Sequence, residues 1–203
     1  MVVKAGDVQW TTAGHGIVHA EAPTKEFVKK GGTLEGIQLW LNLPAKDKLM
    51  PPNYQHLEAA QIPKIFSEDQ KVQLNVIAGN QKDQTGLIKT QTTVNVFTAV
   101  AQENGMLDVD IPQNHQSLIY VLEGTVLVND TKVLKKGENQ MIVFNQDGNS
   151  IHFKAKTTST ILILSGEPIL EKVTQYGPYV MNTQTEILEA MRDYQQGKMG
   201  YLY

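Results

Sequence analysis

The chain has 203 residues, 41% of them hydrophobic, and its 18 basic and 21 acidic residues leave a net charge of −3. This composition is typical of a globular protein, and the slight negative charge excludes a protein that works by neutralising a nucleic-acid backbone. No stretch is apolar for the roughly 18 residues that a membrane helix needs, and the first ten residues lack the pattern of a signal peptide. Cysteine is absent, so disulfides and thiolate ligands are excluded and we expect a cytoplasmic protein.

Short apolar runs rich in Val, Ile, Leu and Thr recur along most of the chain, separated by Gly, Asn, Asp and Pro. This spacing is typical of an all-β sandwich or barrel. The runs predict strands over 36–43, 72–78, 94–99, 117–122, 125–128, 140–144 and 160–164.

The end of the chain reads as a helix. Asn182 or Thr183 can cap it, and Glu186 completes a Thr-x-x-Glu capping box with Thr183. Gly197 is a suitable stop, so the helix is predicted over about 183–196.

Two short segments resemble each other. GDVQW at 6–10 is similar to GENQM at 137–141, and each is followed by a histidine, His19 and His152. About fifty residues of strand-like sequence, 87–136, precede the second copy, whereas five residues precede the first. The pattern indicates one β-unit used twice, the first copy lacking its opening strands.

An incomplete barrel leaves unpaired N–H and C=O groups along its edge, and these must be covered. Either another chain covers the edge, a second copy of this one being a candidate, or the sequence is the remainder of a longer one whose start is not Met1. We keep both explanations.

The stretch GDVQWTTAGHGIVHAEAP at 6–23 strongly resembles the signature of pirins, a family of bicupins. The similarity continues through EGIQLWLNL at 35–43 and LEG at 122–124, and it ends with GEP at 166–168 and QYGPYVMNT at 175–183. The resemblance implies an all-β protein of two cupin-type jelly-roll barrels with a short C-terminal helix.

In this interpretation a partial first cupin domain occupies 1–65, a complete second one 72–166, and a tail 167–203 that packs against the barrels. What is missing relative to the family is everything before Gly6, including a His-x-His pair on an early strand.

His19 and Glu21 are the candidate metal ligands. Their i, i+2 spacing puts both side chains on one face of a strand, and an imidazole and a carboxylate suit non-haem Fe(II). From the residues alone, a surface pair with no role remains an alternative. The resemblance matches them to the family's third and fourth ligands and makes Glu21 a candidate proton acceptor. Because the first two ligands would be the missing His-x-His, only half of the set is present.

The second barrel is predicted to be metal-free. Two residues after His152 stands Lys154, whose ammonium group has no lone pair for a cation. His115 lies near the place of a cupin's first ligand pair, but its i+2 neighbour is Ser117.

Other conspicuous residues are interpreted as structural. Trp10 and Trp40 are expected to be buried aromatics, with substrate stacking as the alternative. His15, between two glycines, is expected in an exposed loop, with a ligand role as the alternative. Three lysines beside Gly31 and Gly32, namely Lys25, Lys29 and Lys30, are expected in a solvated loop, with an anion site as the alternative.

Two functions follow from the resemblance. The first is a quercetin (flavonol) 2,3-dioxygenase that uses a divalent transition metal, Fe(II) above all, with an aromatic flavonol-like substrate. The second is a non-catalytic regulatory module that, like pirins described as transcription cofactors, acts through a protein partner. Neither function involves direct nucleic-acid binding or a membrane.

Overall fold

A computed structural model describes residues 2–202, which fall into two compact units. The first unit comprises the described residues up to Ala5, Gln9–His56 and those from Ile169 onward. The second comprises Gly6–Val8 and Leu57–Pro168. In this division the tail belongs with the N-terminal segment.

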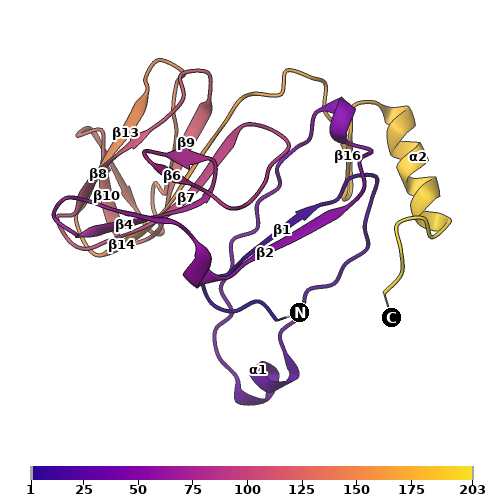
Figure 1. The fold of residues 1–203 in the computed structure, drawn as a ribbon, viewed down its shortest axis with the longest axis horizontal. Coiled ribbons are helices and arrows are strands. Elements are labelled where there is room, and N and C mark those ends of the chain that lie inside the picture. Colours follow the sequence, from indigo (N-terminus) through magenta and orange to yellow (C-terminus); the bar gives the residue numbers. More distant parts are fainter. Residues whose placement is uncertain (1, 203) are drawn as a thin grey trace. The chain divides into compact units, whose positions relative to one another are not determined.

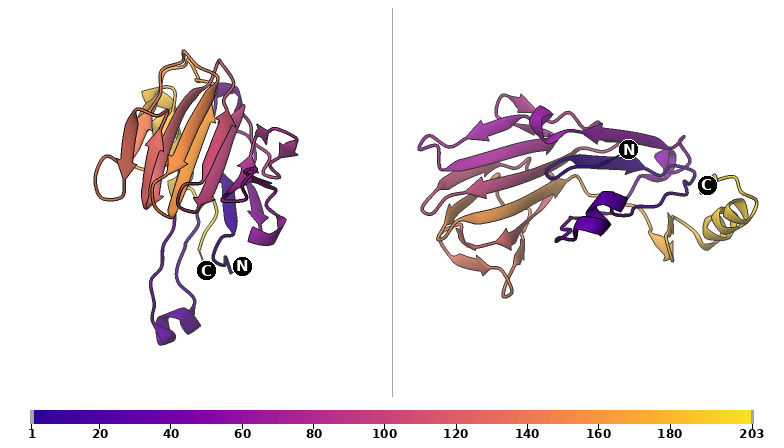
Figure 2. Two further views of the ribbon diagram at one scale, coloured as in Figure 1. Left: turned by 90° about the vertical axis from the view of Figure 1, so that its left-hand side faces the viewer. Right: turned by 90° about the horizontal axis from the view of Figure 1, so that it is seen from below.

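The second unit is an antiparallel β-barrel made of two sheets (Figures 1 and 2). Its strands are β3 (Lys64–Phe66), β4 (Val72–Ala78), β7 (Val94–Ala101), β8 (Met106–Asp110), β9 (Gln116–Glu123), β10 (Thr125–Val128), β11 (Lys132–Lys135), β12 (Met141–Val143), β13 (Ser150–Ala155) and β14 (Ser159–Gly166). One sheet has the order β12-β9-β14-β7-β4-β3 and the other β11-β10-β13-β8. A small hairpin, β5 (Asn80–Gln81) and β6 (Gln84–Thr85), and the 3-10 turn Ala59–Gln61 complete the unit. The prediction of an all-β cupin-type barrel is confirmed, and six of the seven predicted strands are present.

The hydrophobic core lies between these two sheets. Along β13, Ile151, Phe153 and Ala155 are buried while the residues between them face outward. In the larger sheet, Ile163 of β14 lies opposite Ile119 on one side and Phe97 on the other. The period-two pattern of the sequence therefore reports directly which face of each strand is inside.

The first unit contains β1 (Val8–Thr12) and β2 (Asn53–Leu57), which pair as a two-stranded sheet, and a hairpin of β15 (Thr174–Tyr176) and β16 (Tyr179–Met181). Its helices are α1 (Lys25–Lys30), the 3-10 turn Ala45–Asp47 and α2 (Gln184–Gln195). Among the described residues of this unit, the buried side chains are those of Thr12, Lys48 and Ile187. The described part of the first unit therefore has little hydrophobic core. No helix in residues 2–202 is long and apolar enough to cross a membrane.

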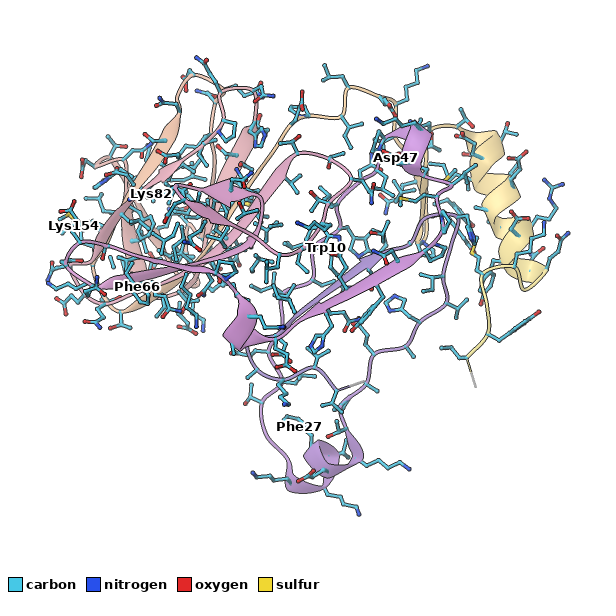
Figure 3. The ribbon with its side chains drawn as sticks, viewed as in Figure 1. Trp10, Phe27, Asp47, Phe66, Lys82 and Lys154 are labelled. Atoms are coloured by element: carbon cyan, nitrogen blue, oxygen red, sulfur yellow. The ribbon has the colours of Figure 1, made fainter. Side chains whose placement is uncertain are left out.

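The strand predicted over 36–43 is wrong. These residues form no regular structure, and the side chain of Trp40 is 63% exposed, which also overturns its expected burial. A strand exists only where a neighbour pairs with its N–H and C=O groups, and none of the described strands pairs with this segment. Trp10, which lies on β1, is half-buried (Figure 3).

The three lysines are exposed as expected, but the loop predicted around them is wrong, because they belong to α1. The Thr24 side chain accepts a hydrogen bond from the Phe27 amide at the start of this helix, and the Gly31 amide donates to the Phe27 carbonyl at its end. Phe27 is labelled in Figure 3. The cap and the closing glycine are visible in the sequence, but the helix between them is too short to show periodicity.

Helix α2 confirms the predicted capping box. The Thr183 hydroxyl accepts from the Glu186 amide at 3.3 Å. In return the Glu186 carboxylate accepts from the amides of Asn182 and Thr183, at 3.1 and 2.7 Å, and from the Thr183 hydroxyl at 2.9 Å. The Thr183 hydroxyl is the largest cause of a lowered Glu186 pKa, and the charge of Lys48 lowers it further.

We therefore expect the start of α2 to loosen in acid. Because the pKa of Glu186 is lower in the folded chain than in the unfolded one, its stabilising effect is complete above the unfolded value and is lost as pH falls through the folded one. Amide hydrogen exchange at Asn182 and Thr183 should accelerate over that range beyond its intrinsic pH dependence. The Glu186→Gln variant should show no such extra acceleration; an identical profile in both proteins would contradict the assignment.

Candidate functional site

His19 and Glu21 lie close together in the segment between β1 and α1. His19 Nδ1 and Glu21 Oε1 are 3.7 Å apart, and the side chains are 51% and 57% exposed. The i, i+2 spacing predicts a shared face of a strand, but residues 19–21 form no strand. The two candidate side chains nevertheless lie close together.

Neighbouring backbone hydrogen bonds hold this segment. The Val18 amide donates to the Met199 carbonyl at 3.0 Å, and the His15 amide donates to the Met50 carbonyl at 2.9 Å. These bonds tie both ends of the 15–18 segment to other parts of the first unit. His19 therefore follows an anchored backbone although it belongs to no regular element.

Gln9 is a residue of the site that the sequence reasoning missed. Its Nε2 donates to Glu21 Oε1 at 2.9 Å, so a side chain on β1 orients the carboxylate. Outer partners of this kind fix the direction of a ligand and tune its basicity. The repeat gave a signal for this residue, because Gln9 and Gln140 occupy the same position in the two similar segments. Gln140 likewise donates a hydrogen bond through its side-chain amide, to the Val121 carbonyl at 3.1 Å.

The donor set is small. Among the described residues no three His, Cys, Asp or Glu side chains gather closely enough to hold a metal ion. His15 is exposed in a turn, as expected, and does not join the pair into such a group. The pair thus offers one imidazole and one carboxylate, which suit a divalent transition metal chemically but are fewer than the three or four ligands that usual sites supply.

The second barrel places its histidines differently. His152 and Lys154 are on the outward face of β13, and His152 Nδ1 lies 2.8 Å from Asp108 Oδ1 on neighbouring β8. Figure 3 labels Lys154 at the surface of the barrel. His115 is instead buried, with Nδ1 3.0 Å from Ser165 Oγ. Burial lowers the His115 pKa, and the charge of Glu167 opposes that effect.

Comparison with known proteins agrees with this architecture. The family model "Pirin C-terminal cupin domain" matches residues 96–200, and the model "Pirin" matches residues 1–41. A Pseudomonas aeruginosa protein named "Putative quercetin 2,3-dioxygenase PA2418" is 38% identical over 196 residues, covering 97% of this chain and 68% of that protein. Human pirin is 33% identical over 201 residues, covering 98% of this chain and 67% of its own length.

A solved structure is also similar. The crystal structure of a quercetin 2,3-dioxygenase from Acinetobacter baumannii has a TM-score of 0.92 and 38% identity, covering 99% of this chain and 69% of that one. The Arabidopsis thaliana pirin-like protein 2 is 35% identical, and the chain spans 61% of it. The matches extend along nearly the whole of this chain but along only about two thirds of its relatives. With these matches and a cupin-type barrel at its C-terminal end, the chain belongs to the pirin family.

Proposed function

We propose that the chain contributes half of a pirin-type metal centre, in which His19 and Glu21 hold a divalent transition metal, Fe(II) above all, for dioxygenation of a flavonol. The observation that carries the proposal is the approach of the two side chains to 3.7 Å, with Gln9 orienting the carboxylate. The relatives named as quercetin dioxygenases support the substrate class. The remaining ligands are expected from polypeptide other than the described residues.

The roles of the two side chains follow from their chemistry. His19 supplies a nitrogen lone pair when its imidazole is neutral, and Glu21 supplies carboxylate oxygens. Bound by them, the metal would act as a Lewis acid toward a deprotonated flavonol and make it reactive to dioxygen. Glu21 would also accept the flavonol hydroxyl proton, which requires a substrate oxygen within hydrogen-bond reach of the carboxylate. Both side chains are half-exposed, so a substrate can reach them.

Metal binding should depend on both members of the pair. In anaerobic titration calorimetry with Fe(II), the His19→Ala and Glu21→Gln variants should each lose more affinity than the roughly 10- to 100-fold that removal of an outer partner costs, because each change removes half of the ligands present. Gln9→Ala should fall within that smaller range.

The chain offers a matched control in His152, another surface histidine beside a carboxylate, Asp108. The His152→Ala variant should bind Fe(II) as the unaltered chain does. If it loses the same affinity as His19→Ala, or if the unaltered chain binds no metal, the proposed site is wrong. Oxygen consumption with quercetin then tests the activity separately: binding without consumption would retain the metal site and reject dioxygenation by this chain alone.

A second candidate function is binding of protein. The observation that favours it is the exposed apolar segment 36–43, where Ile37, Leu39 and Leu41 alternate with larger or polar residues as in a strand but pair with no described strand. Such a segment can add to the edge of a sheet in another chain. We propose that the partner of this segment is a second copy of the chain, since each copy carries the same segment without a described strand beside it.

Self-association should therefore depend on this segment. In light scattering coupled to gel filtration, the unaltered chain is expected to form a dimer, and Leu39→Asp should shift it to a monomer because a buried, unpaired carboxylate is costly. Leu170→Asp is the control, as Leu170 is the same residue type and 94% exposed. A monomer at all concentrations, or equal effects of the two variants, would count against this function.

A further inference from the structure

The segment that leads to His19 carries a motif that the proposed metal pair does not explain. Gly14-His15-Gly16 lies in a turn, in which the Gly16 amide donates to the Ala13 carbonyl at 2.9 Å. Both glycines have positive φ, +56° and +124°, a conformation that residues with a Cβ rarely adopt. Two such positions within three residues call for a reason in the neighbouring structure.

The reason at Gly16 is the side chain of Met199. A Cβ added at Gly16 would lie within 2.7 Å of three atoms of that side chain, Cγ, Sδ and Cε. Non-bonded carbon atoms pack at about 3.5–4.0 Å, so Met199 occupies the space that a larger residue at position 16 would fill. The Val18 amide also donates to the Met199 carbonyl at 3.0 Å. Met199 thus contacts the segment through both its side chain and its backbone, immediately before His19.

The end of α2 holds Met199 in this position. The Gly197 amide donates to the Tyr194 carbonyl at 2.9 Å. The next amide, that of Lys198, donates to the Asp193 carbonyl at 3.0 Å. With Gly197 at φ +73°, these two bonds form a Schellman motif, in which a left-handed glycine ends a helix and turns the chain. The capped helix therefore gives Met199 a fixed support.

The beginning of the motif rests on another part of the first unit. A Cβ added at Gly14 would overlap the carbonyl oxygen of Met50. The same oxygen accepts a hydrogen bond from the His15 amide at 2.9 Å. The segment is therefore enclosed at two points, by the backbone at Met50 and by Met199, and each point requires a glycine facing it.

The two members of the metal pair consequently have separate supports. Glu21 is oriented by Gln9, which lies on β1. His19 follows Val18, whose amide is bonded to Met199. Removing one support leaves the other in place, so experiments can separate their contributions.

We propose that Met199 is a positioning residue for His19: through Gly16 and the Val18 amide it fixes the backbone from which the imidazole approaches Glu21. An unbranched, polarisable thioether suits such a place, because it adapts to an irregular backbone surface. The relevance of this contact to metal binding rests on the proposed function, whereas its effect on His19 does not.

The first test uses the whole chain without metal. In Met199→Ala, amide hydrogen exchange at Val18 should be about fivefold faster or more, because a partly buried apolar contact is lost. Nuclear Overhauser contacts between the His19 ring and the Glu21 side chain should weaken. The side-chain amide signals of Gln9 should stay unchanged, because that support remains. Unchanged exchange at Val18, or unchanged contacts of His19, would overturn the inference.

Two further variants separate positioning from general loosening. Met199→Leu keeps an apolar side chain of similar volume and should restore the exchange rate at Val18. Met181→Ala is the matched control, because Met181 is also half-buried but lies on β16, which pairs with β15. It should leave exchange at Val18 unchanged. Equal acceleration by Met181→Ala and Met199→Ala would mean that the effect is not specific to the contact.

A double-mutant cycle tests the contact itself. Gly16→Ala should accelerate exchange at Val18, because the added Cβ displaces the Met199 side chain. In a Met199→Ala background the Cβ meets a smaller side chain, so the effect of Gly16→Ala should be about threefold smaller or more. What remains there is the cost of a positive φ for alanine. Equal effects in the two backgrounds would show that Met199 does not fill the space beside Gly16.

Metal binding then connects the contact to the proposed function. In anaerobic titration calorimetry with Fe(II), Met199→Ala should lose roughly 10- to 100-fold in affinity, as for an outer partner. Met199→Leu should stay within about threefold of the unaltered chain. Unchanged affinity in Met199→Ala would overturn the positioning role at the metal. If the unaltered chain binds no metal, the proposed function fails, and the metal-free measurements alone decide whether Met199 positions His19.

Discussion

Replacing Phe153 with alanine is expected to lower the free energy of unfolding of the second barrel by about 3–5 kcal/mol. Phe153 is 0% exposed and is one of the largest side chains in the core. Its strand is bonded on both sides, with Phe153 opposite Val128 in β10 and Leu107 in β8. Because both neighbouring strands are held in register, the sheet cannot collapse into the space that the ring leaves.

Phe66→Ala is the matched control, because Phe66 lies on β3 at the edge of the larger sheet and is half-exposed (Figure 3). Its loss should cost about 1 kcal/mol or less. Urea denaturation followed by circular dichroism measures both variants, and hydrogen exchange at Ile163 places the effect in the barrel. Equal destabilisation by the two substitutions would mean that the core is not where the structure places it.

A second large loss is expected from Gly79→Ala, at the turn that follows β4. Gly79 has φ of +82°, and an added Cβ would lie 1.9 Å from Asn95 Oδ1 and 2.5 Å from the Val94 carbonyl oxygen. The left-handed backbone costs about 1–2 kcal/mol for a residue with a Cβ, and the clash adds about 1–3 kcal/mol. The second contact is with backbone, so rotating a side chain does not relieve it.

Gly137→Ala isolates the clash from the backbone term. Gly137 has nearly the same φ, +80°, but an added Cβ there meets no atom within 4 Å. Chemical denaturation should give Gly137→Ala only the cost of the backbone conformation, so the difference between the two variants measures the clash. If they lose equal stability, the close approach of Gly79 to Asn95 is wrong.

Local patterns in the chain predicted much of the fold. The apolar runs at Val72–Ala78 and Thr125–Val128 are strands with those bounds, because their alternation reflects burial on one face and needs no other information. The box formed by Thr183 and Glu186 predicted the start of α2 for a similar reason, since all its partners lie within four residues. Interactions between residues that are close in sequence can therefore be predicted from the sequence itself.

The failures involve partners distant in sequence. The segment 36–43 has the composition of a strand, but a strand also requires a neighbour, and no described strand pairs with it. His152 matches His19 in the repeat, but its place on β13 turns it away from the core, whereas His115, near the expected place of a cupin's first ligand pair, is inside. Successive side chains of a strand point to opposite faces, so a shift of one residue moves a side chain from one face to the other. Matching two short segments whose histidines follow at different distances therefore cannot specify which side chains point inward.

For the proposed metal pair, the sequence singled out the candidate donors, His19 and Glu21, from their residue types, their spacing and the resemblance to pirins. The tertiary structure established what surrounds them: an amide from Gln9, two half-exposed side chains and no third ligand among residues 2–202. It also revealed the contacts that Ser165 makes with Asn95 and His115, three residues that lie far apart in the chain. Donor chemistry is a property of single residues, whereas burial and hydrogen-bond partners depend on which strands the fold brings together.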